Sequence, residues 1–438
     1  MRKVLCSTGI LLSLIFSCNH EKKAVSITDK NGHYEITIDL AGGVSHRTMG
    51  MQYGRELIKA IPDFEEIANT IINMLVIGIC HIDKNSGPEE VFDELLKKTD
   101  TLRSELQKDY YDELEGISSN FHYDATNDYT DKLLSRDEYY LMNFLTDIGG
   151  EFFDGFIGNK FSMQCCSISA FKEGSETGNP VIARIFDFPV TEMRKIHAIT
   201  TIKNRNKSIV MIGFAGCTGI HSAINKHGIF TAIYYSHTGK ECITERKGKS
   251  LIYDLRYALE NYSTLSEVAD YIKTNKSRYI INSLISLSDR NEAKVLECDL
   301  TGEEKTCELR SYDSKLHDGI SWEHKDMIAN VNSFLLYGNE DNHSTQPMNS
   351  TRWDSINTML DKTDSTGKLS IDELIRIASY YRGNRPHSMS EGDIYNDMTG
   401  QIIIFQPVEP SLNVFFCPFD TDSPLIPDFE NIDISILR

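Results

Sequence analysis

Several features are missing from this sequence, and each absence excludes a class of protein. The 438 residues hold 45 Lys and Arg against 64 Asp and Glu, a formal net charge of −19. This acidic balance argues against double-stranded nucleic acid or an anionic membrane surface as the ligand. The sequence contains no paired Cys-x-x-Cys units, no internal repeat and no low-complexity tract, which argues against a zinc ribbon or a repeat array. With 40% hydrophobic residues, it is instead typical of a folded protein with a large core.

A long apolar run occurs at the N-terminus and is not repeated later. Residues 1–17 have a basic start and an apolar stretch from Val4 to Phe16, the form of a secretory leader that is too short for a membrane span. The ending Ile-Phe-Ser-Cys resembles a bacterial lipoprotein box, in which Cys18 is lipidated and becomes the mature N-terminus. We therefore predict an exported lipoprotein of a bacterial cell envelope, attached to the membrane only through Cys18, with residues 18–28 as a tether. An ordinary cleaved leader is the alternative.

The apolar pattern changes near residue 165. Before it, an alternating segment at 34–40 predicts an edge strand, and apolar residues recur at helical spacing from 46 to 75. After it, short β-prone runs alternate with helices, one of them opened by a capping box at 264–267. This succession predicts a layered α+β fold. We expect helices at 88–98, 102–110, 137–148, 250–261, 266–273, 351–360 and 370–379, and strands at 198–202, 209–214, 222–224, 229–235, 280–286, 293–298, 327–336, 401–405 and 413–416.

The cysteines do not form a metal or disulfide framework. Besides Cys6 and Cys18, which belong to the predicted leader and lipidation site, eight cysteines lie at wide and irregular spacings. Cys298 and Cys307 are placed to close a hairpin with a disulfide, although buried free thiols fit the sequence equally well. Cys165 and Cys166 are adjacent, and neighbouring cysteines neither chelate one metal nor form a disulfide without strain. A nucleophilic role for one of them is the stronger interpretation.

The segment from Cys166 to Pro189 predicts a β-hairpin with a thiol at one end, and Arg184 and Asp187 near the other. It contains no histidine to act as a base. Cleavage of the Cys165–Cys166 peptide bond would expose the α-amine of Cys166, which titrates at about 7.7 to 8.0 and can accept the thiol proton. Asp187 would hold that amine and Arg184 would favour the thiolate. Taken alone, a buried cysteine is more often a core residue, and the Arg–Asp pair a surface ion pair.

These residues together resemble the N-terminal-nucleophile hydrolases of the linear amide C–N hydrolase group, which includes choloylglycine hydrolase, acid ceramidase and penicillin acyltransferase. In that group an autocatalytically exposed Cys, followed by Ser or Thr and an apolar strand, precedes an Arg-x-x-Asp-aromatic segment. Here the matching segments are Cys166-Ser-Ile and Arg184-Ile-Phe-Asp-Phe188. The spacing from Cys to Arg, 184 − 166 = 18, is a little longer than usual in the group.

Further motifs extend the resemblance. Gly50-Met-Gln-Tyr-Gly54 resembles the small-residue helix start of the acyltransferase branch. Ser222-Ala-Ile-Asn-Lys-His-Gly-Ile229 resembles a turn whose Asn, here Asn225, contributes its backbone amide to the oxyanion hole; taken alone, Asn225 would be a turn residue. The side-chain amide of Asn332 would be the second oxyanion donor, with Ser333 replacing the usual His. In Asn349-Ser-Thr-Arg352 the resemblance implies a structural or substrate-orienting cation, Arg352.

The resemblance implies a four-layer αββα sandwich made as one precursor of two subunits. Residues 29–165 would be a helical α-subunit or pro-region, and residues 166–438 the catalytic part. Cys166 would attack the carbonyl of Cys165 to free itself, and then hydrolyse the linear amide bond of a small N-acyl amide through a thioester. No metal or organic cofactor is implied. The alternatives are acyl transfer from the same acyl-enzyme and, in another class, a surface lipoprotein that binds ligands without catalysis.

Overall fold

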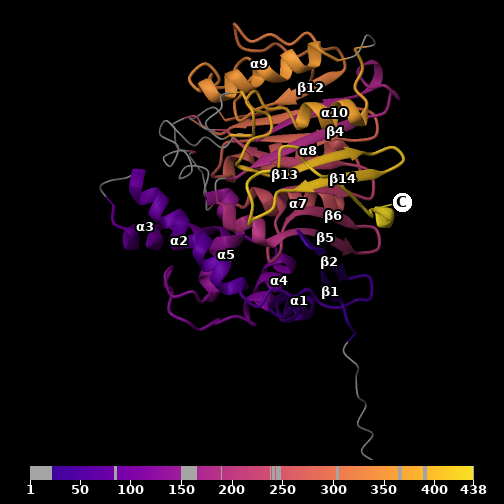
Figure 1. The fold of residues 1–438 in the computed structure, drawn as a ribbon. Coiled ribbons are helices and arrows are strands. Elements are labelled where there is room, and N and C mark those ends of the chain that lie inside the picture. The colour runs from indigo at the N-terminus through magenta and orange to yellow at the C-terminus, as the bar shows by residue number, and fades with distance from the viewer. Residues whose placement is uncertain are drawn as a thin grey trace, which may run out of the picture.

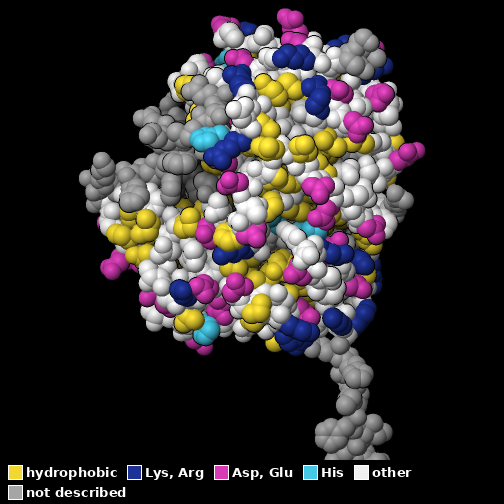
Figure 2. Space-filling view, viewed as in Figure 1, with side chains coloured by type: hydrophobic (Ala, Val, Ile, Leu, Met, Phe, Trp, Pro, Cys, Tyr) yellow, Lys and Arg dark blue, Asp and Glu magenta, His cyan; other side chains and the backbone are white. Residues whose placement is uncertain are grey.

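The structure is a computed structural model that describes residues 22–82, 86–148, 165–188, 190–236, 238, 242, 248–301, 305–363, 367–387 and 392–437. The predicted leader, residues 1–17, and the predicted lipidation site Cys18 lie outside the described residues. None of the described helices combines the length and the apolar character that a membrane span requires. On the face shown in Figure 2, acidic and basic side chains are interspersed among hydrophobic ones.

Two β-sheets form the centre of the molecule (Figure 1). The larger has the strand order β1-β2-β5-β6-β7-β8-β9-β10-β11, and the smaller the order β12-β3-β4-β13-β14-β15. Neighbouring strands are antiparallel, except that β2 and β5 run parallel. The bounds are β1 Val25–Asp29, β2 Tyr34–Asp39, β3 Cys166–Ala170, β4 Val181–Asp187, β5 His197–Lys203, β6 Ile209–Phe214, β7 Ser222–Asn225, β8 Phe230–Tyr235, β9 Ser283–Ser288, β10 Ala293–Asp299, β11 Thr306–Arg310, β12 Met327–Asn330, β13 Thr399–Gln406, β14 Ser411–Phe416 and β15 Glu430–Ile432.

Helices cover the outer faces of the two sheets. Helices α7 and α8 contact strands of the larger sheet, and α10, beside α9, contacts β4 and β13 of the smaller one. The remaining helices gather at one end of the larger sheet (Figure 1, indigo to purple). The predicted α+β fold with αββα layers is therefore confirmed. The helices are α1 His46–Ala60, α2 Phe64–Ile82, α3 Pro88–Arg103, α4 Lys108–Ser118, α5 Arg136–Asn143, α7 Leu251–Asn261, α8 Leu265–Asn275, α9 Pro347–Asp361 and α10 Ile371–Ala378, with short 3-10 turns η1 Lys172–Gly174, η2 Thr191–Ile196, η3 Lys276–Arg278 and η4 Ser435–Leu437.

Local signals in the sequence predict the centres of elements well. The capping box that opens α8 forms as expected, with the Thr264 hydroxyl accepting from the Glu267 N–H and the Glu267 carboxylate accepting from the Thr264 N–H. The β10–β11 hairpin places Cys298 opposite Cys307, and a disulfide joins them. The structure thus selects the disulfide over the free thiols that the sequence left open.

The N-terminal part of the chain differs from the prediction in two ways. The predicted edge strand is β2, and it is an interior strand because it pairs with β1 along one edge and with β5 along the other. Residues Val25–Asp29, assigned mostly to a tether, form β1. Val25 and Ile27 do alternate with Ser26 and Thr28 in β1, but two apolar residues next to the predicted leader are too short a pattern to be recognised as a strand.

The predicted helices before residue 120 also need correction. The predicted helix at 102–110 is wrong, because α3 ends at Arg103 and α4 begins at Lys108. The apolar stripe from 46 to 75 belongs to two helices rather than one, with Pro62 in the break between α1 and α2. Proline lacks the N–H that a helix interior requires, so the break falls where it is expected once the stripe is read residue by residue.

Helices α1 and α4 pack backbone against backbone through glycines. A Cβ atom added at Gly50 would overlap the backbone oxygen of Glu113, and one added at Gly116 would overlap the backbone oxygen of Arg47. The small-residue pattern of Gly50 to Gly54 therefore serves this close helix crossing, in which larger side chains have no space.

We predict that Gly116→Ala lowers the free energy of unfolding by about 1 to 3 kcal/mol, because the new methyl group forces the two helices apart. Urea denaturation measures the change. Gly32→Ala is the matched control, because a Cβ atom at Gly32 meets nothing within 4 Å and should change stability by no more than about 0.5 kcal/mol. Equal stability of the two variants would contradict the close crossing.

Asp147 joins the N-terminal helices to the start of α7. Its Oδ1 accepts the Leu251 N–H at 2.8 Å, and the Ser250 hydroxyl donates to its Oδ2 at 2.5 Å. The side chain is buried, and burial raises its pKa to about 7, although the two hydrogen bonds oppose the shift. The contact that holds the two parts of the chain together is therefore sensitive to pH.

We predict that this carboxyl makes the protein less stable as the pH rises from about 4 to 7. The folded pKa lies above the unfolded one, so the contribution is fully present below the unfolded pKa and is lost as the pH rises through the folded pKa. Asp147→Asn keeps an acceptor for Leu251 but cannot titrate, so its stability should fall less steeply over this range. Urea unfolding at a series of pH values tests this; an unchanged slope in the variant would refute it.

Candidate functional site

The predicted hairpin of the thiol segment is present in the smaller sheet. Strand β3 pairs with β4 so that Cys166 lies opposite Ile185 and Ser167 opposite Arg184. Strand β12 pairs with the other side of β3, which is therefore an interior strand. Cys165 directly precedes β3 and contacts the end of β4, with its Sγ 3.4 Å from both the backbone N and the backbone O of Asp187.

The alternation of side chains along β3 places the two adjacent thiols on opposite faces of the sheet. The Ser167 hydroxyl lies 2.8 Å from that of Ser286 on β9, so Ser167 faces the other sheet. Cys166 belongs to the apolar core under α9 and α10, together with Ile168 and Ala170. Cys165 belongs to the core on the inter-sheet side. The period of two in a strand therefore separates neighbours in the sequence.

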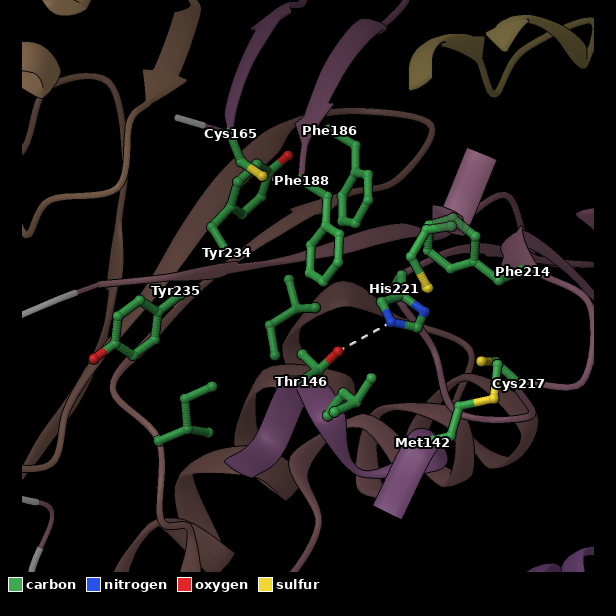
Figure 3. Close-up of a pocket in the computed structure, with 14 residues that line it drawn as sticks. Met142, Thr146, Cys165, Phe186, Phe188, Phe214, Cys217, His221, Tyr234 and Tyr235 are labelled. Atoms are coloured by element: carbon green, nitrogen blue, oxygen red, sulfur yellow. Dashed lines mark hydrogen bonds between the residues drawn. The ribbon is translucent and has the colours of Figure 1, made fainter. Parts of the chain in front are cut away.

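An apolar pocket lies on the inter-sheet side, and Cys165 forms part of its wall (Figure 3). Aromatic rings from β4, β6 and β8 surround it, and residues in and just after α5 close one side. Both the N-terminal helices and the sheets thus contribute to one pocket. Its lining residues are Met142, Leu145, Thr146, Cys165, Phe186, Phe188, Met193, Phe214, Cys217, His221, Ile233, Tyr234, Tyr235 and Ile281.

Arg184 lies behind this wall as a buried cation with unused donors. Its guanidinium lies 4.3 Å from the ring centroid of Phe186 and 5.3 Å from that of Tyr234, and both rings line the pocket. Its Nη2 donates to the Ile233 backbone oxygen at 3.3 Å. Nε and Nη1 have no hydrogen-bond partner among the described residues. A buried guanidinium in this state is a ready donor to an anion or to a carbonyl that becomes one.

Arg352 and Asp187 form a buried ion pair on the other face of the smaller sheet. The Arg352 Nη2 lies 2.7 Å from the Asp187 Oδ2, and neither side chain is exposed. Asn396 donates to the same Oδ2 at 2.9 Å, and Thr399 donates to Oδ1 at 2.7 Å. The carboxylate that the sequence assigns to holding an α-amine is thus already held by three donors.

The two thiols have different electrostatic surroundings. Burial raises the pKa of Cys166 to about 12, and the strongest opposing influence is the charge of Arg352. Burial also raises the pKa of Cys165, and there the strongest opposing influence is Arg184. In the intact chain both cysteines are therefore thiols at neutral pH, and a base is needed to form the nucleophile.

The two predicted oxyanion donors are not equally placed. The Asn225 N–H donates to the Ile229 oxygen at 3.0 Å and closes the β7–β8 hairpin, so, contrary to the prediction, it is not available to a substrate. The Asn332 side chain lies past the end of β12, and its Nδ2 donates at 2.7 Å to the backbone oxygen of Tyr235, a pocket residue. Asn332 therefore reaches the strand that lines the pocket, whereas Asn225 lies at the far end of β7.

Sequence reasoning missed two groups that the structure brings to the pocket. The resemblance assigns Cys165 only to the position before the cleavage site, although the alternation that places Ser167 opposite Arg184 also predicts which face of the sheet Cys165 occupies. His221 lies 3.0 Å from the Thr146 hydroxyl (Figure 3), and burial lowers its pKa to about 4. His221 is thus neutral at physiological pH. Among the described residues, no group of His, Cys, Asp and Glu side chains is arranged to hold a metal.

Comparison with known proteins finds similarity in structure but not in sequence. No family model matches the chain, and no curated protein matches its sequence. A solved structure of the Caenorhabditis elegans ortholog of N-acylethanolamine-hydrolyzing acid amidase is similar at a TM-score of 0.40 and 14% identity, covering 56% of this chain and 93% of that one. Two variants of conjugated bile acid hydrolase from Clostridium perfringens give TM-scores of 0.37 and 0.35, with 12% and 11% identity.

The two bile acid hydrolase structures each match 62% of this chain and cover 92% and 93% of their own lengths. All three similarities therefore extend over most of the other protein and over little more than half of this one. With TM-scores of 0.40 and below, they do not support a function for this chain. An inference about the function of this protein has to rest on its own side chains.

We predict that Arg352→Met lowers the free energy of unfolding by about 3 to 5 kcal/mol, because it leaves the buried Asp187 carboxylate without its cation. Denaturant unfolding measures the loss. Lys325→Met is the matched control: it breaks a pair with Glu173 in which both side chains are more than half exposed, and it should change stability by less than about 1 kcal/mol. Similar losses in both variants would show that the buried pair has no special structural role.

Proposed function

We propose that this protein is a cysteine amidohydrolase that cleaves the linear amide C–N bond of small N-acyl amides. The observation that carries the proposal is the combination of a thiol and an unused guanidinium at one apolar pocket. Cys165 forms part of the pocket wall, and Arg184 lies against two of the pocket's rings, with its Nε and Nη1 unpaired among the described residues. Such a pair supplies the nucleophile and the anion-stabilising group that acyl transfer to a thiol requires.

The chemistry proceeds in two balanced steps. The thiolate adds to the amide carbon, a C–S bond forms, and the C–N bond breaks as the departing amine takes up the proton that the thiol gave to the base. Water then attacks the thioester, which releases a carboxylic acid and restores the thiol. The base is the α-amine of the cysteine itself, because an α-amine titrates near neutral pH. His221 is not needed, and its lowered pKa makes it a weak base.

An α-amine becomes available only when the chain is cut before the nucleophile. We therefore include autocatalytic cleavage at the vicinal cysteines in the proposal. The resemblance in sequence implies a cut between Cys165 and Cys166, which would free the α-amine of Cys166, whereas a nucleophilic Cys165 would require a cut on its own N-terminal side. Residues on the N-terminal side would remain as an α-subunit or be lost as a pro-region. The proposal also retains export as a lipoprotein anchored at Cys18.

The pocket supports an apolar acyl group as the part of the substrate that is bound. Its wall is mostly aromatic and aliphatic, and few polar side chains interrupt it. Ligand sites of this kind bind apolar groups through buried area and orient them through a few polar contacts. Arg184 would orient the carbonyl oxygen. Fatty-acyl amides and acyl-amino acids fit this description, whereas amides without an apolar acyl part do not.

Two other functions remain as alternatives. The same acyl-enzyme would act as an acyltransferase if an amine, rather than water, reached the thioester. A surface lipoprotein of the same fold would bind an apolar ligand in the pocket without cutting itself or the ligand. Activity measurements distinguish these functions directly.

We predict that the purified full-length protein releases amine from at least one member of a panel of N-acyl amides, and that its intact mass shows two fragments. The panel pairs long-chain acyl ethanolamides and acyl-glycines with their acetyl counterparts. The matched control is the double variant Cys165→Ala/Cys166→Ala, which should stay one chain and release no amine above background. Adding hydroxylamine separates acyl transfer, which yields a hydroxamate, from hydrolysis.

An uncleaved wild-type chain that releases no amine from any substrate would overturn the proposal. In that case fluorescence titration with the long-chain acyl ethanolamides distinguishes a binding protein, which still takes them up, from a protein with neither function. Hydrolysis by the double variant at the wild-type rate would show instead that the activity does not depend on these thiols.

A further inference from the structure

We propose that the nucleophile is Cys165 rather than Cys166, and that the chain cuts itself on the N-terminal side of Cys165. This inference rests on the proposed amidohydrolase function and assigns its central residue. Cys166, the residue that the spacing in the sequence favours, is then a structural thiol of the helix-covered core. The proposal depends on which face of β3 each thiol occupies, on what lies beside each of them, and on what each possible cut would separate.

The first argument is access. The Cys165 side chain is part of the wall of the apolar pocket, beside Phe186, Phe188 and Tyr234 (Figure 3). Cys166 lies on the opposite face of the strand, in the core that α9 and α10 cover. Moving the Cys166 thiol to the pocket would require turning β3 over, which would send Ile168 and Ala170 to the wrong side and break the pairing with both β4 and β12.

The second argument is the charged group available to each thiol. Arg184 faces the same inter-sheet side as Cys165, where it lies against Phe186 and Tyr234 and keeps Nε and Nη1 without partners among the described residues. Arg352, on the side of Cys166, also has its Nε and Nη1 unpaired in the part of the chain that the structure describes. It is, however, committed to Asp187 and to the Ile394 oxygen, and it lies in the packed layer with Cys166. A substrate carbonyl bound at the Cys165 sulfur would lie on the same side of the smaller sheet as Arg184.

The third argument is what a cut would leave on each side. Cys165 precedes β3 and is held to the end of β4 through the Asp187 backbone. A cut before Cys165 leaves β3, the pocket thiol and its contact with β4 on one polypeptide. A cut between Cys165 and Cys166 would transfer the pocket thiol to the end of the other polypeptide and would leave the new α-amine on the residue whose side chain faces away from the pocket.

The maturation step then balances as follows. The Cys165 thiol adds to the carbonyl carbon of the preceding residue, Gln164 in the sequence. The C–N bond of that peptide breaks, the C–S bond forms, and the Cys165 nitrogen takes the thiol proton and becomes a free amine. Water hydrolyses the thioester, which leaves a carboxylate on Gln164 and a free thiol beside the α-amine of Cys165. Water is the one other reactant, and the step needs no oxidant or metal.

Two single variants and the end of one fragment test the proposal. In the wild type, N-terminal sequencing of the C-terminal fragment should read Cys165-Cys166-Ser167. Cys166→Ala should still cut itself, whereas Cys165→Ala should remain one chain and lose amide hydrolysis to background. Circular dichroism and the melting temperature of each variant show whether a loss of cleavage reflects a loss of folding.

A chemical readout decides the question even if a variant fails to fold. In the wild-type protein, iodoacetamide followed by peptide mapping should alkylate Cys165 at least about tenfold faster than Cys166, because Cys165 lines the apolar pocket and Cys166 lies in the core under α9 and α10. A fragment that begins at Cys166, or faster alkylation of Cys166, would overturn the assignment and leave the proposed function standing. A wild type that neither cuts itself nor hydrolyses any amide would instead refute the proposed function, and the alkylation rates would still report which thiol the pocket exposes.

Discussion

The buried pair of Arg352 and Asp187 connects the layers around the end of β4. The Asp187 carboxylate is shared by Arg352 on α9, by Asn396 just before β13 and by Thr399 at the start of β13. Its backbone holds the Cys165 sulfur at the same time. One residue thus fixes the smaller sheet to its helical layer and fixes the position of the thiol relative to the sheet. Removing a charged member of such a group is costly because the remaining ion has no water to replace its partner.

The two faces of strand β3 have different roles: one packs in the helix-covered core, and the other faces the larger sheet and the proposed site. One face contributes Ile168 and Ala170 to the core beneath α9 and α10. On the other face Ser167 contacts β9, and Cys165, just before the strand, lies on this same side in the pocket wall. The same division holds on β4, where Asp187 faces the helices and Arg184 faces the pocket rings. Mutations on one face therefore act mainly on stability, and those on the other act on the site.

Much of this arrangement can be predicted from the sequence, because it depends on local patterns. The hairpin follows from two apolar runs and a turn, and the α8 start follows from the positions of Thr264 and Glu267. The role of Asn225 could not be predicted, because a turn asparagine and an oxyanion donor have the same residue type and differ only in which group receives the N–H. The pairing of β2 with β5 could not be predicted either, because two parallel strands that are distant in the sequence leave no local pattern that links them.

The parallel contact of β2 with β5 has a consequence for what maturation would produce. Strands β1 and β2 precede Cys165 in the chain, yet they form the edge of the larger sheet through backbone hydrogen bonds to β5, and Met142 and Thr146 supply part of the pocket. A cut before Cys165 would therefore yield an interlocked heterodimer rather than a body and a discarded propeptide. Dissociation of either piece would expose an unpaired edge of the larger sheet and would open the side of the pocket that Met142 and Thr146 close, so the cleaved chain would fold and denature as one unit.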